Sequence, residues 1–211
     1  MRRLKSHYHH GSLRAALIES TARLVAEKGP SGVSLREAAR RVGVSEAAPY
    51  QHFADKSALL TGVADAGFEL LHLSISAALE GAPPDPVDRL EALSLAYLRF
   101  ALDRPHYFRL MFGRLSDVRA STAAPAVPLF DHFVESVRAA RLSHGHDDED
   151  SLNAAALLWS VPHGLALLYL DGSVDAGIDP RALEDLVRAG VRALVAAPLP
   201  EVGNNEPTWG I

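Results

Sequence analysis

A short polar segment in the N-terminal third carries side chains that suit contact with nucleic acid. Tyr50, His52 and Lys56 offer a hydroxyl, an imidazole and an ammonium group, which bind phosphate oxygens and fix register without reading sequence. Gln51 can form a pair of hydrogen bonds with adenine. Taken singly, Tyr50 also fits an ordinary surface aromatic and Gln51 a solvated side chain. The chemistry therefore depends on the elements that hold these residues.

The residues just before this segment are small or acidic. Ala47 and Ala48 permit close approach to base edges or to thymine methyl groups. Glu46 repels phosphate unless its carboxylate accepts a hydrogen bond from a cytosine amino group. Phe53, which follows them, is expected in the core.

Helix stop and start signals surround the segment. Apolar positions at helical spacing predict a helix over residues 13–28, which a Gly-Pro pair ends. Residues 34–37, SLRE, form a capping box and begin a second helix that runs to Val42. Residues 43–45, Gly-Val-Ser, lead to a third helix with Ser45 as its cap. Two short capped helices joined by a turn containing glycine form a helix-turn-helix.

The third and fourth helices carry interruptions. Pro49 lies inside the third helix, where it removes one early hydrogen bond and is expected to distort the first turn. Asp55 caps a long fourth helix over residues 56–81. Gly62 and Gly67 weaken this helix locally, which makes it a candidate for transmitting conformational change.

Charge is divided unevenly along the chain. Residues 1–60 contain 10 Lys and Arg against 5 Asp and Glu, whereas the remainder contains 11 against 21. A basic N-terminal module on an acidic body attracts a polyanion at one end. Chance clustering of surface charge explains the same asymmetry. The charge distribution therefore indicates nucleic-acid binding only together with a motif.

The overall composition is that of an ordinary globular protein. The 211 residues are 48% hydrophobic and 22% charged, with a formal net charge of −5, and they suffice for a sizeable core. The absence of cysteine excludes disulfides, thiolate metal ligands and cysteine nucleophiles, and it fits a reducing compartment. No apolar run follows the basic residues 1–12, so no secretory signal is expected and a cytoplasmic location is predicted.

Residues 34–60, SLREAARRVGVSEAAPYQHFADKSALL, resemble the DNA-binding region of the tetracycline-repressor (TetR) family of bacterial transcriptional regulators. In that family a Gly-Val-Ser turn leads to a Tyr-x-His-Phe recognition helix, then to an acidic or polar cap and a lysine. Residues 8–17 are similar to the N-terminal opening of one subgroup. The resemblance implies a helix-turn-helix that binds double-stranded DNA. The expected DNA-binding residues are Ser34, Arg36, Ser45, Glu46, Ala47, Ala48, Tyr50, Gln51, His52 and Lys56.

The rest of the chain predicts further helices. The proline-rich residues 81–86 separate the long helix from one over residues 87–103, and a short helix over residues 106–113 follows. Residues 114–127 are rich in Ser, Thr, Ala and Pro and are expected to form a loop. Pro128 is expected to begin the next helix, which ends before the polar connection at residues 144–150.

The last two predicted helices are strongly apolar. Residues 152–170 are apolar nearly all round and approach the length of a membrane span, but they include Asn153 and Pro162 and lack flanking Lys or Arg. An apolar stripe runs along the helix over residues 180–197. We therefore expect a two-fold interface of four helices rather than a membrane span. The Pro-, Asn- and Gly-rich residues 198–211 are expected to be a flexible tail.

A second resemblance lies in the C-terminal part. Trp159, His163 and Gly164 are similar to the Trp-His-Gly signature of one C-terminal domain subtype of the TetR family, and residues 104–113 to another segment of it. The resemblance implies a homodimer through the last two long helices and a pocket for an unknown small-molecule effector. Trp159 and His163 share a helix face, either as a pocket wall or as a packed core pair. The expected ligand-binding residues, which also suit a core, are Tyr97, Tyr107, Phe108, Met111, Phe112, Phe130, Trp159 and His163.

Other chemistries have less support in the sequence. The histidines of residues 7–10, HYHH, and of residues 144–150, HGHDDED, could bind a metal, but they lack His-x-x-x-His spacing and lie in predicted loops. We find no G-x-S-x-G, P-loop or dinucleotide fingerprint. No metal, cofactor, catalytic residue or enzymatic activity is therefore expected.

These observations predict an all-α protein of about nine helices. A three-helix, helix-turn-helix DNA-binding domain spans residues 1–57, a helical effector-binding and dimerisation domain spans residues 58–197, and the tail follows. The expected function is that of a homodimeric repressor that a small molecule releases from a pseudo-palindromic operator. The alternative is a helical bundle that does not bind DNA, or a membrane-associated interaction protein, which would leave the helix-turn-helix unexplained.

Overall fold

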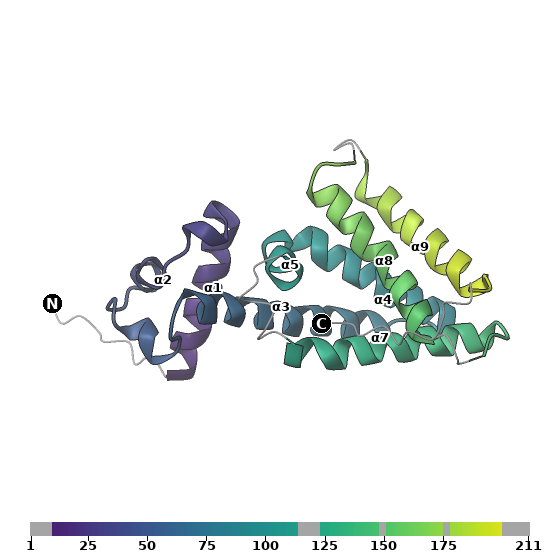
Figure 1. Ribbon diagram of the computed structural model, residues 1–211, viewed down its shortest axis with the longest axis horizontal. Coiled ribbons are helices and arrows are strands. Elements are labelled where there is room, and N and C mark those ends of the chain that lie inside the picture. Colours follow the sequence, from purple (N-terminus) through teal and green to yellow (C-terminus); the bar gives the residue numbers. More distant parts are fainter. Residues whose placement is uncertain (1–9, 114–122, 148–150, 175–177, 200–211) are drawn as a thin grey trace. The chain divides into compact units, whose positions relative to one another are not determined.

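The chain is helical throughout the part that the computed structural model describes, residues 10–113, 123–147, 151–174 and 178–199. Eight α-helices and two short 3-10 helices follow one another in these ranges (Figure 1). The all-α class is confirmed, and the expected number of about nine helices is close to the observed one.

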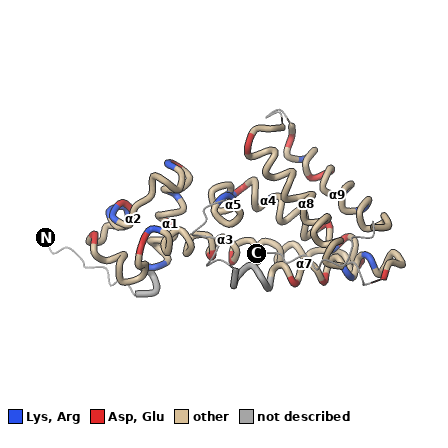
Figure 2. The backbone as a smooth tube through the Cα atoms, in the orientation of Figure 1, with Lys and Arg blue, Asp and Glu red and all other residues tan. Residues whose placement is uncertain are grey.

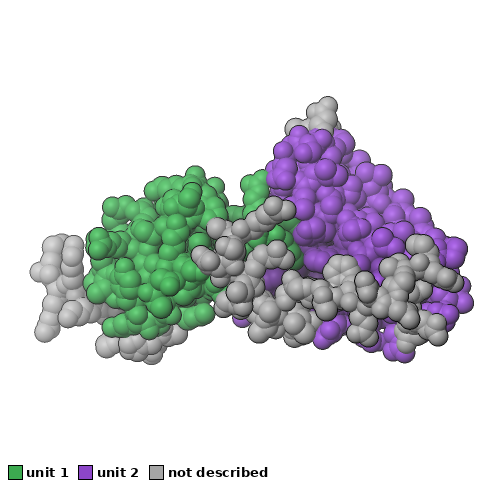
Figure 3. Space-filling view, viewed as in Figure 1, with its two compact units in different colours: residues 1–67, 106–122 green, residues 68–105, 123–211 purple. Residues whose placement is uncertain are grey.

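Two compact units divide the chain. One comprises residues 1–67 and 106–122, and the other comprises residues 68–105 and 123–211 (Figure 3). The division falls inside the long helix α3 (Lys56–Glu80) and assigns most of α5 (Pro105–Phe112) to the N-terminal unit. Because packing contacts do not define function, the functional boundary after residue 57 stays a prediction.

The N-terminal unit is built on α1 (His10–Lys28), which contacts both the 3-10 helix η1 (Pro30–Gly32) and α2 (Leu35–Val42). Leu17 and Leu24 of α1 are completely buried, as are Ala38 and Ala39 of α2. The two alanines allow close helix packing because their side chains end at Cβ. This small core fixes α2 and the segment that follows it.

The third N-terminal helix differs from the prediction. Residues 48–51 form a 3-10 turn, η2 (Ala48–Gln51), rather than an α-helix capped by Ser45. Pro49 has no N–H to donate to the Ser45 carbonyl four residues earlier, so the amide of Ala48 donates to it instead, at 3.0 Å. The expected distortion therefore extends over the whole element.

Two glycines of α3 are sites of close packing. A Cβ at Gly62 would lie 3.0 Å from Cε1 of Phe53, and a Cβ at Gly67 would lie 2.6 Å from Sδ of Met111 and 3.3 Å from Cδ1 of Tyr107. The absence of a side chain lets α3 approach Phe53 and α5 closely. These glycines thus have a packing role beyond the local weakening expected from the sequence.

The second unit has α4 (Pro86–Asp103) at its centre. This helix contacts α7 (Ala123–Ser143), α8 (Ser151–Leu170) and α9 (Pro180–Ala196), and α8 lies beside α9 (Figure 1). A Cβ at Gly190 of α9 would lie 2.9 Å from Cγ1 of Val161, so this glycine permits the close approach of α9 to α8. The core around α4 includes Phe100, Leu158 and Leu183.

Helix α7 begins earlier than predicted. It starts at Ala123, within the stretch expected to be a loop, rather than at Pro128. Alanines are strong helix formers, and Pro125 falls in the first turn, where the backbone N–H groups have no intrahelical acceptor. The rest of the expected loop, residues 114–122, and most of the expected tail lie outside the described residues.

Candidate nucleic-acid interface and effector site

The residues expected to bind DNA all reach the surface of the N-terminal unit. Tyr50 is 54% exposed, and Ala47 and Gln51 are exposed beside it. Pro49 and Phe53, in contrast, are buried and anchor the turn. The side chains of Ala48, His52 and Lys56 are partly exposed. Those of the remaining expected residues are exposed: Ser34, Arg36, Ser45 and Glu46. The buried anchors hold η2 so that its other side chains face outward.

Both ends of α2 are fixed by local hydrogen bonds. The Ser34 hydroxyl accepts from the Glu37 amide at 3.2 Å, which confirms the predicted N-cap. Gly43 ends the helix with a φ of 80°, a left-handed conformation that glycine adopts without strain. The amides of Gly43 and Val44 donate to the carbonyls of Arg40 and Ala39 at 3.2 and 3.0 Å. This Schellman turn directs the chain from α2 into η2.

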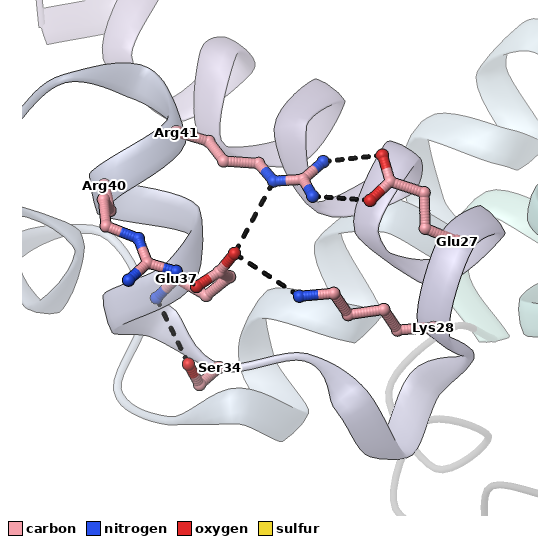
Figure 4. Close-up of polar contacts among 6 residues, drawn as sticks. All are labelled: Glu27, Lys28, Ser34, Glu37, Arg40 and Arg41. Atoms are coloured by element: carbon pink, nitrogen blue, oxygen red, sulfur yellow. Dashed lines mark hydrogen bonds and ion pairs between the residues drawn. The ribbon is translucent and has the colours of Figure 1, made fainter.

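A charge network joins α1 to α2 (Figure 4). The guanidinium of Arg41 donates to both carboxylate oxygens of Glu27, at 2.8 and 2.5 Å, and these bonds lower the pKa of Glu27. Glu37 pairs with Arg40 and lies 3.6 Å from Nζ of Lys28. The Glu37 carboxylate is therefore engaged by cations, whereas the capping box predicts that it reaches back to the start of α2.

The basic residues of this unit are largely balanced by nearby acids (Figure 2). Arg23 pairs with Glu19 within α1, and Nε of Arg36 lies 3.6 Å from Oε2 of Glu46. These pairs and the α1–α2 network engage most of the cations in the described part of this unit. Over those residues, the excess of basic residues in the sequence does not give an unpaired basic surface. The network residues hold α2 in position, a role that the sequence analysis missed.

Two expected phosphate ligands have partners or constraints of their own. Nζ of Lys56 donates to the carbonyl of Ser31 at 2.8 Å. Nε2 of His52 is buried and has no hydrogen-bond partner among the described residues, so Nδ1 is the ring nitrogen that remains for the expected phosphate contact. The Asp55 carboxylate accepts from the Ala58 amide at 2.8 Å, which confirms the predicted cap of α3.

Four of the residues expected to bind an effector form one cluster in the second unit. The Tyr97 hydroxyl lies 2.7 Å from Nδ1 of His163, and the ring centroids of Trp159 and His163 are 5.1 Å apart. Phe130 meets Trp159 edge-on at 6.2 Å. Burial lowers the pKa of His163 and raises the pKa of Tyr97 far above its usual value. Both side chains are therefore neutral at pH 7.

The other four expected effector residues belong to α5. Phe108 and Met111 are buried, and the rings of Phe108 and Phe112 are 5.0 Å apart. Tyr107 and Met111 lie against Gly67 of α3. These contacts give the α5 residues a packing role within the N-terminal unit.

The structure also bears on metal and membrane binding. The part of the chain described here has no group of three or more His, Asp or Glu side chains arranged to hold a metal ion. Most of the HYHH segment and part of HGHDDED lie outside this part. Two helices, α3 and α8, are long and apolar enough to cross a membrane by length and composition.

Two family models match the chain. One, described as bacterial regulatory proteins of the tetR family, covers residues 17–63. The other, described as a tetracyclin repressor-like C-terminal domain, covers residues 90–194. The first contains all of α2, the Schellman turn and η2, and the second contains Tyr97, Phe130, Trp159 and His163.

Solved structures show the same fold. A protein of unknown function from Rhodococcus sp. RHA1 is 31% identical, with a TM-score of 0.72 over 90% of this chain and 97% of that one. A putative transcriptional regulator from Pseudomonas aeruginosa PAO1 is 23% identical, with a TM-score of 0.75 over 90% and 94% of the two chains. The TetR family transcriptional regulator PfmR from Thermus thermophilus is 21% identical, with a TM-score of 0.62 over 85% and 96%.

Proposed function

Because this chain belongs to the TetR family of DNA-binding transcriptional regulators, we propose that it is a repressor that a small-molecule effector releases from a pseudo-palindromic operator. The observation that carries the proposal is the outward-facing turn η2, held by buried Pro49 and Phe53 beside the capped helix α2. Family members act as dimers, so two such surfaces would enter successive major grooves about 34–36 Å apart, or a multiple of that distance.

Each side chain of this surface has a proposed role in binding. Gln51 reads a base edge, and Ala47 and Ala48 allow the backbone to approach the groove. Tyr50 and Lys56 bind phosphate oxygens, as do His52, Ser34 and Ser45. For Lys56, binding DNA means exchanging the Ser31 carbonyl for a phosphate, or donating to both.

The proposed dimer interface is the outer face of α8 and α9. Leu152, Leu157 and Leu168 of α8 are 45%, 41% and 47% exposed, and Leu186 of α9 is 52% exposed. Helix α8 is buried within the chain to a smaller extent than α3, although both helices are similarly apolar. A second copy of this chain would cover this apolar face. With this face covered by a second copy, the proposed regulator needs no membrane and is cytoplasmic.

The proposed effector site is the cluster of Tyr97, Phe130, Trp159 and His163. It offers aromatic surface together with a few polar atoms, a combination common in small-molecule sites. Packing of the same residues as an ordinary core is the competing explanation. Release from the operator requires a conformation in which the two DNA-binding surfaces no longer match the spacing of the half-sites. The effector must bind this conformation more tightly, because equal affinity for both conformations does not change their populations.

Selection of bound duplexes from a random DNA pool tests the function. We expect a two-fold symmetric consensus, and gel-shift titrations should then show weaker binding for Tyr50→Ala and Lys56→Ala. For Lys56→Ala the slope of log affinity against log salt should fall by about 1. Arg181→Ala, an exposed cation at the start of α9, is the matched control and should leave the slope unchanged. If no consensus sequence is selected and the protein binds lipid vesicles instead, the result would favour the membrane-associated alternative.

A further inference from the structure

An ion pair joins α2 to the turn that leads into η2. Arg36 lies in the first turn of α2, and Glu46 directly follows Ser45. Nε of Arg36 is 3.6 Å from Oε2 of Glu46. The two side chains are 73% and 70% exposed. A pair so exposed contributes little to folding, and both side chains are open to contact with DNA on the proposed surface.

A carboxylate on this surface is costly for general affinity but useful for base selection. Phosphates repel Glu46, and the pairing of Glu46 with Arg36 withdraws a cation from phosphate binding. In the major groove, however, a carboxylate accepts only from the amino groups of cytosine or adenine. Guanine O6 and N7 and thymine O4 are themselves acceptors and repel it. Glu46 therefore penalises guanine and thymine at the position that it faces.

The same contact orients Arg36. A carboxylate held at Nε leaves the two terminal Nη groups to donate, and an arginine commonly donates from such a fork to O6 and N7 of guanine. Guanine and cytosine occur together in one base pair, so the two side chains match the two bases of a G·C pair or of adjacent G·C pairs.

We propose that Arg36 and Glu46 act together as a specificity-determining pair that reads G·C in each operator half-site. Arg36 donates to guanine, and Glu46 orients Arg36 and accepts from cytosine. This inference rests on the proposed function and extends it by naming the base pair that the surface selects and the acidic residue that enforces the selection.

Selection of bound duplexes by the wild-type chain, Glu46→Gln and Arg36→Lys tests the pair. The wild type should select G·C at one position or at two adjacent positions of each half-site. Arg36→Lys keeps the charge but loses the fork, and should lose the guanine preference by about 5- to 100-fold. Glu46→Gln should lose preference at the same position, while its affinity for unrelated duplex rises because one repulsive charge is gone.

Glu19→Gln is the matched control, because Glu19 is 65% exposed and pairs with Arg23 in the same unit. It should change no base preference. Equal thermal melting of all four proteins would establish that the variants are folded. If the wild type selects a consensus and Glu46→Gln keeps every preference within twofold, the pairing role is wrong and the proposed function stands. If the wild type selects no consensus at all, both are wrong.

Discussion

The Tyr97 hydroxyl in α4 and Nδ1 of His163 in α8 lie 2.7 Å apart, although the two residues are 66 positions apart in the sequence. Burial lowers the pKa of His163, so its ring is neutral at pH 7 and one of its nitrogens must accept. Trp159 also hydrogen-bonds to Tyr97, and an indole N–H can only donate. The arrangement that satisfies all three groups has Trp159 donating to Tyr97 and Tyr97 donating to Nδ1 of His163.

This arrangement predicts acid sensitivity of the folded chain. Well above pH 6.5 the His163 ring is neutral in both the folded and the unfolded chain. As the pH falls through 6.5 the unfolded chain takes up a proton that the folded chain does not yet bind, so the free energy of unfolding declines until the lower, folded pKa is reached. Urea unfolding of the wild type and of His163→Gln, each at pH 7.5 and pH 5.5, measures this term. An identical decline in the two proteins would contradict it.

Tyr97→Phe tests the hydrogen bond itself. The variant keeps the buried ring but leaves the acceptor of His163 and the donor of Trp159 without the hydroxyl, so we expect a loss of about 1–3 kcal/mol of unfolding free energy at pH 7.5. Tyr169→Phe, at the end of α8 and partly exposed, is the control and should lose much less. If the two variants lose equal amounts of unfolding free energy, the 2.7 Å contact does not contribute to stability beyond an ordinary tyrosine hydroxyl.

Gly43 is a position in the N-terminal unit where backbone conformation, rather than space, decides the effect of a substitution. Its φ of 80° is strained for any residue with a Cβ, although no atom would obstruct one. Gly43→Ala should therefore lower unfolding free energy by about 1–2 kcal/mol and weaken operator binding, because the Schellman turn directs η2. Gly81→Ala also enters open space but without a positive φ, and should be nearly neutral. A Gly43→Ala variant as stable as Gly81→Ala would refute the argument.

Features with a short-range cause could be predicted from the sequence. Ser34 and Asp55 were expected as helix caps, and each accepts from the amide three residues ahead. Such bonds need only the local backbone, and the residue types that form them are few. The sequence predicts that Pro49 distorts the first turn of this helix. Residue types alone do not show that the remaining residues are too few to restore an α-helix.

Contacts that depend on tertiary packing could not be predicted. The pairing of Arg41 with Glu27 and of Arg99 with Glu184 joins residues 14 and 85 positions apart. Many exposed cations and acids could pair equally well, and only the packing of α2 on α1, or of α9 on α4, selects among them. For the same reason, the sequence does not show that the eight residues expected around an effector fall into two groups. Only the packing separates the cluster around Tyr97 from the group on α5.

The Arg99–Glu184 pair predicts a second, more acidic dependence of stability on pH. Arg99 donates to both carboxylate oxygens of Glu184, at 2.7 and 2.6 Å, and lowers the pKa of Glu184 below 4.5. The stabilisation is therefore fully present above pH 4.5 and is lost as the pH falls through the folded pKa. Arg99→Gln should cost about 0.5–1 kcal/mol at pH 7 and flatten the decline below pH 4.5.

Arg23→Gln provides the comparison for this pair. Arg23 pairs with Glu19 inside a single helix, so its loss uncouples no two elements. Thermal melting between pH 3 and pH 7 should show a smaller effect for Arg23→Gln than for Arg99→Gln. The interpretation fails if both variants melt alike across this range.

The apolar face of α8 and α9 gives the sharpest test of assembly. Leu168 and Leu186 are 47% and 52% exposed, and a glutamate at either position would be buried without a partner in the proposed interface. Breaking an interface with an unpaired buried charge costs about 3 kcal/mol or more, so Leu168→Glu and Leu186→Glu should raise the dimer dissociation constant by at least about 100-fold. Sedimentation at several concentrations measures that constant. Leu73→Glu, on α3 and 63% exposed, should leave it unchanged. If Leu73→Glu dissociates the dimer and the α8 and α9 variants do not, the interface lies elsewhere.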